Sequence, residues 1–494
     1  MKTLLTLLFL AVPATAQFDV DISIDTRAKV FRVHESFANP SGEDVDLWIA
    51  RWTPGAYHPA DFGRFAKDFT ATDGAGHALD VERVDDSHLR IHANGARDLR
   101  VDYVAESISS GVLSHGTIID VESNRIRDDY AYVTPVSLVA FVPGRLDEPY
   151  SVSFEVPDGW KTATVLEADD EGRYSAPSFY RLEDSPVFFA PDLTTVETEA
   201  GGRPLEVSVH GLPAGEVDDV VDGCKRIVEA AASMMGGLPY DRYEFLLSYT
   251  SNGGGSGLEH SFSTLILMTQ GMPLDAQWGI IAHEFFHLWC AERVHVEGIR
   301  HPDYTKSFSS KTLWVNESVT EYLSRHVLLR AGLIDREGFF ASFQSPLRMA
   351  SFATDIPSAT KASLLAENWE SGQDLMVWSM RMYMLQPLTM LALDLEMRRV
   401  SGGKRGLVDF VKTAMKEYDA KGRGFPEDSV QEILERVAGG DLCRIYARSI
   451  EGTDPPDLAS ALGVIGYELD GDEFRPLSDP TPEQLAARAD FFGS

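Results

Sequence analysis

The stretch "IAHEFFHLWCAERV" (Ile281–Val294) has the length and the apolar content of a buried helix. In its middle stand His283, Glu284 and His287, and unpaired ionisable groups are costly to bury. Residues four apart lie on one helical face, so the two histidines point the same way, with about 6 Å of axial rise between them. Two neutral imidazoles at that spacing can bind one zinc ion, and Glu284 lies where it can take a proton from the attacking water. The pattern therefore predicts a zinc site; the alternative is a helix with two hydrogen-bonded core histidines.

A catalytic zinc ion usually has three protein ligands and an open position. The next helical pattern, "LWVNESVTEYLSRHVLLRAG", runs from Leu313 to Gly332, and Gly332 suits the position that ends a helix. Glu317 lies in its first turns, with 29 residues between it and His287, which is ample for a connecting loop. It is the candidate third ligand. Glu321, four residues later, could accept the free ring N–H of a ligand histidine, or it could be an ordinary solvated glutamate.

The organisation along the chain predicts an α+β protein with several domains. Residues 17–205 alternate apolar and polar residues in short segments between turn signals, which favours an N-terminal antiparallel β-sandwich. Residues 206–465 are mostly helical, after strands at "YEFLLSYT" and "FSTLILM" that flank a glycine-rich loop, "SNGGGSGLEH". Residues 466–494 are a polar tail that the pattern predicts to be weakly ordered.

Composition and targeting signals limit the partners and the location. The net charge of −32 disfavours nucleic acid as a partner. Residues 1–16, "MKTLLTLLFLAVPATA", have the charged start, apolar run and small-residue end of a secretory signal peptide, which predicts a periplasmic or secreted protein. An N-terminal anchor or a strand is the alternative. No later segment is long and apolar enough for stable membrane insertion, and three cysteines allow at most one disulfide.

Eight stretches of the sequence follow one another in a recognisable order: "WTPGAY", "GLPYDRYEFLL", "GGGSGLEHSFSTLI", "HEFFHLW", "LWVNESVTEYL", "LLRAGL", "LALDLEMRRVSGGKRGL" and "IYARSIEGTDPPDLASALG". In this order they resemble the glycyl aminopeptidases, gluzincin metallopeptidases with an N-terminal β domain and a thermolysin-like catalytic domain. The resemblance implies one Zn²⁺ per chain on His283, His287 and Glu317, with Glu284 as the general base.

Two further roles are implied by the resemblance. "GLEH" resembles the exopeptidase signature of the related aminopeptidase N family, which would make Glu259 the ligand of the substrate's free amine. The glycine run that ends at Gly257 would let a peptide backbone approach closely. Tyr383 aligns with the family's tyrosine that donates to the oxyanion. The alternatives are a loop carboxylate for Glu259 and a core or surface residue for Tyr383.

The chain departs from the family's pattern in three places. Leu385 and Gln386 replace the Lys-Gly pair that follows the tyrosine, and Cys290 and Glu292 replace an Asn and a basic residue after the histidine motif. Family members also commonly end in a PDZ domain, and the residues after Gly463 are too few for one, so none is expected. The predicted function is zinc-dependent hydrolysis of peptide bonds that releases a small N-terminal residue. A zinc endopeptidase and a non-catalytic peptide-binding protein on a peptidase fold are the alternatives.

Overall fold

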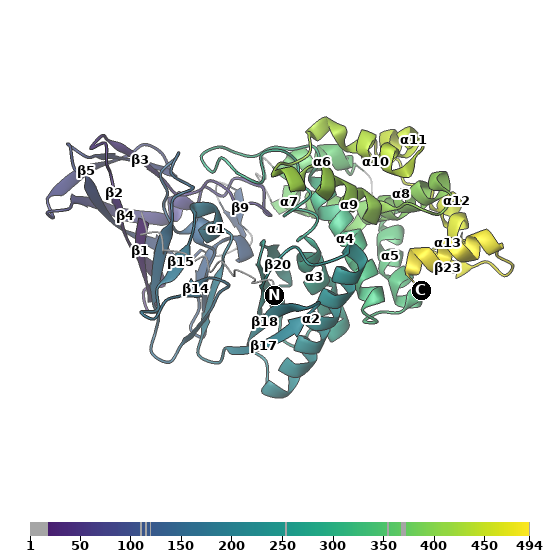
Figure 1. The fold of residues 1–494 in the computed structure, drawn as a ribbon, viewed down its shortest axis with the longest axis horizontal. Helices are drawn as coiled ribbons and strands as arrows, with labels where there is room; N and C mark the ends of the chain where they lie inside the picture. Colours follow the sequence, from purple (N-terminus) through teal and green to yellow (C-terminus); the bar gives the residue numbers. More distant parts are fainter. Residues whose placement is uncertain are drawn as a thin grey trace, which may run out of the picture.

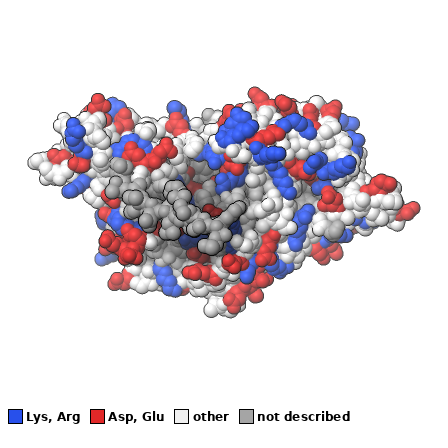
Figure 2. All heavy atoms as spheres, viewed as in Figure 1, with Lys and Arg blue, Asp and Glu red and all other residues white. Residues whose placement is uncertain are grey.

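The computed structural model describes residues 18–108, 111–113, 116–118, 120–251, 254–352, 355–366 and 372–493. The predicted signal peptide (1–16) and Gly253 of the glycine run lie outside these residues. Figure 1 shows two parts side by side: strands dominate the first part of the chain and helices the last. Figure 2 shows acidic and basic side chains scattered over the visible face of both parts. Strands β17, β18 and β20 and helices α2 and α3 lie where the two parts meet (Figure 1). The chain is therefore a multidomain α+β protein.

The N-terminal part is built on a ten-stranded sheet in the order β14-β15-β12-β1-β2-β7-β4-β5-β6-β3. Its strands are β1 (Phe18–Asp25), β2 (Val30–Ala38), β3 (Val45–Trp48), β4 (Ala66–Asp73), β5 (Ala78–Arg83), β6 (His88–His92), β7 (Asp98–Glu106), β12 (Tyr150–Glu155), β14 (Glu167–Ala168) and β15 (Tyr174–Ala176). Buried and open positions alternate along β1, β2 and β7, as a strand with one face on a core requires. The sheet is not purely antiparallel, because β1 pairs in parallel with β12.

Smaller elements complete this part. A four-stranded sheet has the order β10-β11-β16-β13, and β8 pairs with β9. The bounds are β8 (Gly111–Leu113), β9 (Gly116–Ile118), β10 (Asn124–Ile126), β11 (Ala131–Val133), β13 (Lys161–Ala163), β16 (Val187–Ala190), α1 (Phe179–Glu183) and the 3-10 turns η1 (Phe62–Phe65), η2 (Asp120–Glu122) and η3 (Pro135–Ser137).

A separate five-stranded sheet, β17-β18-β19-β21-β20, begins the second part. Its strands are β17 (Thr194–Ala200), β18 (Arg203–His210), β19 (Tyr243–Thr250), β20 (Ser256–Glu259) and β21 (Ser263–Thr269). The boundary expected at residue 205 falls inside β18, so the change of sheet comes about ten residues earlier than the pattern indicated. The prediction of a loop over residues 251–260 is wrong at its end. Residues 256–259 form an edge strand, because their backbone pairs antiparallel with β21.

Helices make up most of the rest of the chain. They are α2 (Ala214–Met235), α3 (Leu274–Phe286), α4 (Leu313–Arg330), α5 (Arg336–Ala350), α6 (Ala359–Leu365), α7 (Gly372–Ser379), α8 (Gln386–Ser401), α9 (Leu407–Glu417), α10 (Val430–Ala438), α11 (Cys443–Ile445) and α12 (Leu458–Leu462), with π-helical turns at Met380–Leu385 and Tyr446–Ile450 and 3-10 turns at Asp419–Lys421, Glu427–Ser429 and Gly463–Ile465. Within the described ranges, none of the helices combines the length and hydropathy that a membrane crossing needs. The cysteines Cys224, Cys290 and Cys443 are all free.

The helix with the histidine motif is shorter than the sequence indicated. Helix α3 ends at Phe286, and His287 is its C-cap rather than an interior residue. The amide of His287 still donates to the carbonyl of His283 (3.2 Å), so the two side chains remain one turn apart. Helix α4 ends as expected, with Gly332 in the left-handed region (φ 65°) just beyond it.

The C-terminal segment is packed, so the prediction of a weakly ordered tail is wrong. It forms the hairpin β22 (Tyr467–Asp470) and β23 (Glu473–Pro476), then helix α13 (Pro482–Phe492). Phe491 and Phe492 are buried and contact Phe339 of α5 edge-on. Few apolar residues occur in this segment, but two adjacent aromatic rings at its end supply a large buried surface.

A buried carboxyl in the β-rich part gives the first prediction. Glu35 of β2 accepts hydrogen bonds from the Tyr103 hydroxyl (2.5 Å) and the Ala140 amide (2.8 Å), and burial raises its pKa from 4.5 to about 7. Because the folded state favours the protonated form, its stability falls as the pH rises from about 4.5 to above 7. Glu35→Gln removes this penalty. We expect the free energy of unfolding of Glu35→Gln, minus that of wild type, to be about 3 kcal/mol larger at pH 8.5 than at pH 4.5. Urea unfolding at the two pH values measures this difference.

Glu171→Gln is the matched control, since Glu171 is exposed in the turn between β14 and β15. Its stability relative to wild type should show no such dependence. If the difference between Glu35→Gln and wild type is the same at both pH values, the Glu35 carboxyl titrates normally and this account of it is wrong.

Candidate metal centre

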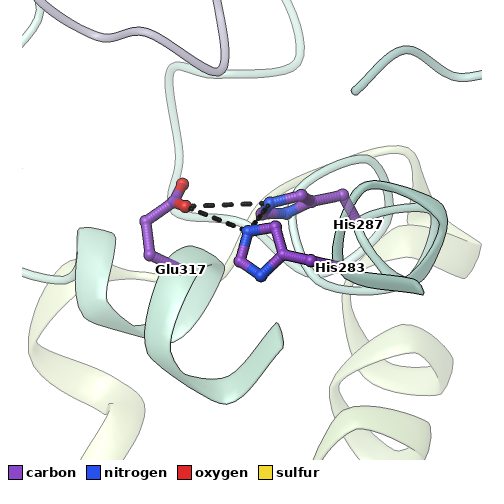
Figure 3. A group of neighbouring side chains, drawn as sticks. All are labelled: His283, His287 and Glu317. Carbon is purple, nitrogen blue, oxygen red and sulfur yellow. Dashed lines mark hydrogen bonds and ion pairs between the residues drawn. The ribbon is translucent and has the colours of Figure 1, made fainter. Parts of the chain in front are cut away.

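Two helices bring the three predicted metal ligands together. His283 and His287 come from the end of α3, Glu317 comes from the first turns of α4, and these two helices pack against each other. The Nε2 atoms of the histidines are 2.9 Å apart, and each lies 3.7 Å from Oε2 of Glu317 (Figure 3). The point that is equally far from these three ligand atoms lies about 2.0 Å from each of them, which is the length of a zinc–nitrogen bond.

Hydrogen bonds fix both imidazoles in the form that a metal requires. Nδ1 of His283 lies 2.9 Å from the Glu321 carboxylate, and Nδ1 of His287 lies 2.9 Å from the carbonyl oxygen of Cys290. Both partners are acceptors, so each Nδ1 carries a proton, and in the neutral ring each Nε2 is left with the lone pair that a metal ion needs. Two buried lone pairs that face each other beside a carboxylate repel unless a cation lies between them. The residues therefore fit a zinc ion.

The carboxylate of Glu321 is held on its other side by an arginine. Burial would raise the pKa of Glu321, but Arg325, whose guanidinium donates to it at 2.8 Å, and His283 hold that pKa below its usual value. Glu321 therefore stays ionised and can orient His283. The predicted position of Glu321 behind the metal ligands agrees with this geometry.

Glu284 and Glu259 line the same small pocket, of about 50 Å³, as the three ligands. Burial raises the pKa of Glu284 to about 7, and burial together with the charge of Glu317 raises that of Glu259 to about 8. Gly257 lies directly against Glu284, since a Cβ atom there would come within 2.5 Å of its carboxyl group. This glycine therefore leaves the room that the Glu284 side chain occupies.

Tyr383 also reaches the pocket. It lies in the π-helical turn before α8, and its hydroxyl donates to Oε2 of Glu317 at 2.9 Å. Burial and the charge of Glu317 raise the pKa of this hydroxyl, so it remains a proton donor. The replacement of the Lys-Gly pair by Leu385 and Gln386 has thus not moved the tyrosine away from the metal ligands.

A loop of the β-rich part lines one side of the site, although the sequence alone assigns no role to it. Gly55 and Ala56 line the pocket. Gly55 has φ 85°, and a Cβ atom there would meet the Glu259 carboxylate at 2.8 Å. The Tyr57 hydroxyl accepts a hydrogen bond from Asn316, the neighbour of Glu317, at 3.0 Å. The motif "WTPGAY" was the available signal, but nothing in it shows which part of the chain it contacts.

Solved structures of peptidases share this fold. An aminopeptidase N family protein from Idiomarina loihiensis is 21% identical, with a TM-score of 0.81 over 91% of this chain and 78% of its own. An M1 zinc metallopeptidase from Deinococcus radiodurans, bound to a Tyr-Ser-Ala substrate, is 12% identical, with a TM-score of 0.56 over 89% and 95%. Leukotriene A4 hydrolase from Saccharomyces cerevisiae is 14% identical, with a TM-score of 0.54 over 92% and 70%. At these identities the likeness concerns the fold.

Sequence comparison identifies the family. No curated protein matches the chain. The model of the peptidase M61 N-terminal domain matches residues 17–191, and that of the M61 glycyl aminopeptidase matches residues 276–377, which include all three candidate metal ligands. Two models of one family thus match more than half of the sequence, and the chain belongs to the M61 peptidase family.

Proposed function

We propose that this peptidase is a zinc-dependent aminopeptidase that releases one N-terminal residue from a peptide. The observation that carries the proposal is the triangle of His283, His287 and Glu317, with the Glu259 carboxylate only 3.9 Å from the His287 ring. A carboxylate that lines the same pocket as the metal ligands can pair with a free ammonium and so place the first peptide bond at the metal.

The space around the ligands favours a small N-terminal residue. The pocket is narrow, and Trp378 and Tyr383, which contact each other, line it with Gly55 and Gly257. Glycine or alanine are the side chains that such a space admits most easily. We further propose a thermolysin-like architecture for the catalytic domain, and an exported location on the basis of the signal-peptide pattern of residues 1–16.

Each residue of the site has a chemical role in this proposal. His283, His287 and Glu317 would hold the zinc ion, which when bound polarises the scissile carbonyl and lowers the pKa of water. Glu284 takes the proton of the attacking water and passes it to the leaving amine. The Tyr383 hydroxyl donates to the oxygen on which negative charge develops. Glu321 keeps His283 oriented.

Matched peptides with free and acetylated N-termini test the aminopeptidase assignment. A free α-amine is largely cationic near neutral pH, so it pairs with Glu259, whereas an acetylated one carries no charge. We expect zinc-loaded enzyme to release the first residue of the free peptide, and to cut the acetylated peptide at least about 10-fold more slowly. A chelator should abolish both activities.

Glu259→Gln, which keeps the shape and removes the charge, should lower kcat/KM for the free peptide by about 10- to 100-fold. It should change cleavage of the acetylated peptide far less. Internal cleavage of the acetylated peptide by wild type at a similar rate would identify an endopeptidase. Zinc binding without cleavage of any peptide would instead favour a peptide-binding protein.

A further inference from the structure

A second cavity, of about 270 Å³, shares Glu259 with the metal-site pocket. Three more carboxylates line it: Glu183 and Asp184 from the end of α1, and Glu292 from the turns after α3. The loop that contains Gly55 and Ala56 lines this cavity as well, through Thr53 and Pro54. The two spaces therefore meet at the residue that we assign to the substrate's amine.

The carboxylates of this cavity are incompletely neutralised. Arg181 is 3.9 Å from Asp184, and its guanidinium lies over the Phe262 ring. The two other arginines that line the cavity are directed elsewhere: Arg300 donates to Asp419 (2.7 Å), and Arg293 donates to the carbonyl of Pro239 (2.7 Å). Glu292 accepts a hydrogen bond from the Ser261 hydroxyl, and Asp184 accepts one from the Ser261 amide. These hydrogen bonds come from a neutral serine and supply no positive charge to either carboxyl group.

Two buried imidazoles provide a second, independent sign of a ligand. His260 and His295 line the cavity and are 4% and 1% exposed. Among the described residues, neither Nδ1 of His260 nor Nε2 of His295 has a hydrogen-bond partner. Nδ1 of His295 lies 3.0 Å from the carbonyl of Val296 and so carries the proton, which leaves Nε2 as an acceptor. Buried polar atoms are rarely left unpaired, so the two ring nitrogens call for a group with N–H donors, whereas Nη1 of Arg181 and Nε of Arg293, which also lack a hydrogen-bond partner among the described residues of this lining, call for acceptors.

The pKa values of the carboxyl groups are those expected of a site that binds a cation. Burial, then the charge of Glu292, raises the pKa of Asp184 to about 8, and burial raises that of Glu292 to about 7. Near neutral pH these acids are therefore partly protonated when the cavity contains no cation. A bound cation would favour the ionised form of both, and it would also offset their mutual repulsion.

We propose that this cavity binds the cationic side chain of an N-terminal lysine or arginine while Glu259 holds the α-amine. The inference rests on the proposed aminopeptidase function and adds a second substrate class to it. Glycine and alanine fit the narrow pocket because they are short. An unbranched basic side chain fits because it can extend past Glu259 into the acidic cavity. A branched or aromatic side chain offers no positive charge to the acidic cavity, so activity should not follow residue size alone.

The test compares lysyl and norleucyl amides, whose side chains are both linear and differ in charge. With zinc-loaded, full-length enzyme we expect kcat/KM to be at least about 10-fold higher for the lysyl amide. Glu292→Gln should lower this lysyl-to-norleucyl ratio by about 10-fold, whatever the absolute rates, and Asp184→Asn should lower it similarly. Glu244→Gln is the control, because Glu244 is a buried glutamate on β19 that does not line the cavity; its ratio should match that of wild type.

The outcomes separate this inference from the proposed function. Hydrolysis of alanyl amide with a lysyl-to-norleucyl ratio near one would overturn the inference and leave the aminopeptidase intact. An unchanged ratio in both Glu292→Gln and Asp184→Asn would overturn it as well. If no amide is hydrolysed, the proposed function fails, and calorimetry with free L-lysine and L-norleucine decides on the cavity. Tighter binding of L-lysine that weakens in Glu292→Gln would support it, and equal binding would refute it.

Discussion

Glu284→Gln is expected to retain zinc and lose nearly all turnover. The substitution keeps the shape of the side chain, and Gly257 still leaves room for it, but an amide cannot accept the proton of the attacking water. General acid–base groups contribute about 10²- to 10⁴-fold, so kcat should fall by at least that factor. Turnover of an alanyl amide and zinc content by metal analysis, on the same sample, measure the two effects.

Glu297→Gln provides the control for Glu284→Gln. Glu297 is an exposed glutamate in the segment that follows the histidine motif. It is the same type of residue as Glu284 and is close to it in sequence, but it does not line the pocket. It should behave as wild type in both measurements. Near-normal turnover of Glu284→Gln would mean that another group accepts the proton.

Glu317→Ala is expected to lose metal and activity together. It removes one corner of the triangle and leaves the two Nε2 atoms 2.9 Å apart without the carboxylate that completes the set of three ligands. The site then offers two protein ligands, whereas catalytic zinc sites typically have three. We expect wild type to hold about one zinc per chain after dialysis against a weak chelator and Glu317→Ala to hold almost none.

Glu321→Ala should have a zinc affinity between that of wild type and that of Glu317→Ala. It removes the acceptor of the His283 ring N–H but none of the ligands, and such losses typically weaken metal binding about 10- to 100-fold. The order of zinc affinity should therefore be wild type, Glu321→Ala, Glu317→Ala. Full zinc occupancy in Glu317→Ala would show that the third ligand has been misassigned.

The metal ligands could be predicted from the sequence because their geometry is mostly local. Helical periodicity alone places His283 and His287 one turn apart, and the same periodicity relates Glu317 to Glu321. The length of the connection allowed Glu317 to return to the histidines, although only the fold shows that it does. The early end of α3 did not disturb this, because a C-cap residue still continues the helical turn.

The rest of the site depends on contacts between distant residues, which a single sequence does not reveal. Tyr57 and Asn316 are 259 positions apart and yet form a hydrogen bond. The acidic cavity combines residues from α1, β20 and the turns after α3, none of which has a motif of its own. The packing of Phe491 and Phe492 was missed for a similar reason: two aromatic residues in a polar segment produce no periodic signal.

For protein engineering, the Thr53–Tyr57 loop means that the two halves of this enzyme are not interchangeable modules. The loop belongs to the β-rich half, but its residues line both the metal-site pocket and the acidic cavity. A catalytic half produced alone would lack a wall of its own substrate site. A chimaera that carries the β-rich half of a relative would acquire that relative's loop and, with it, a different selectivity. Grafting this short loop alone is therefore the more economical way to redesign which N-terminal residues are accepted.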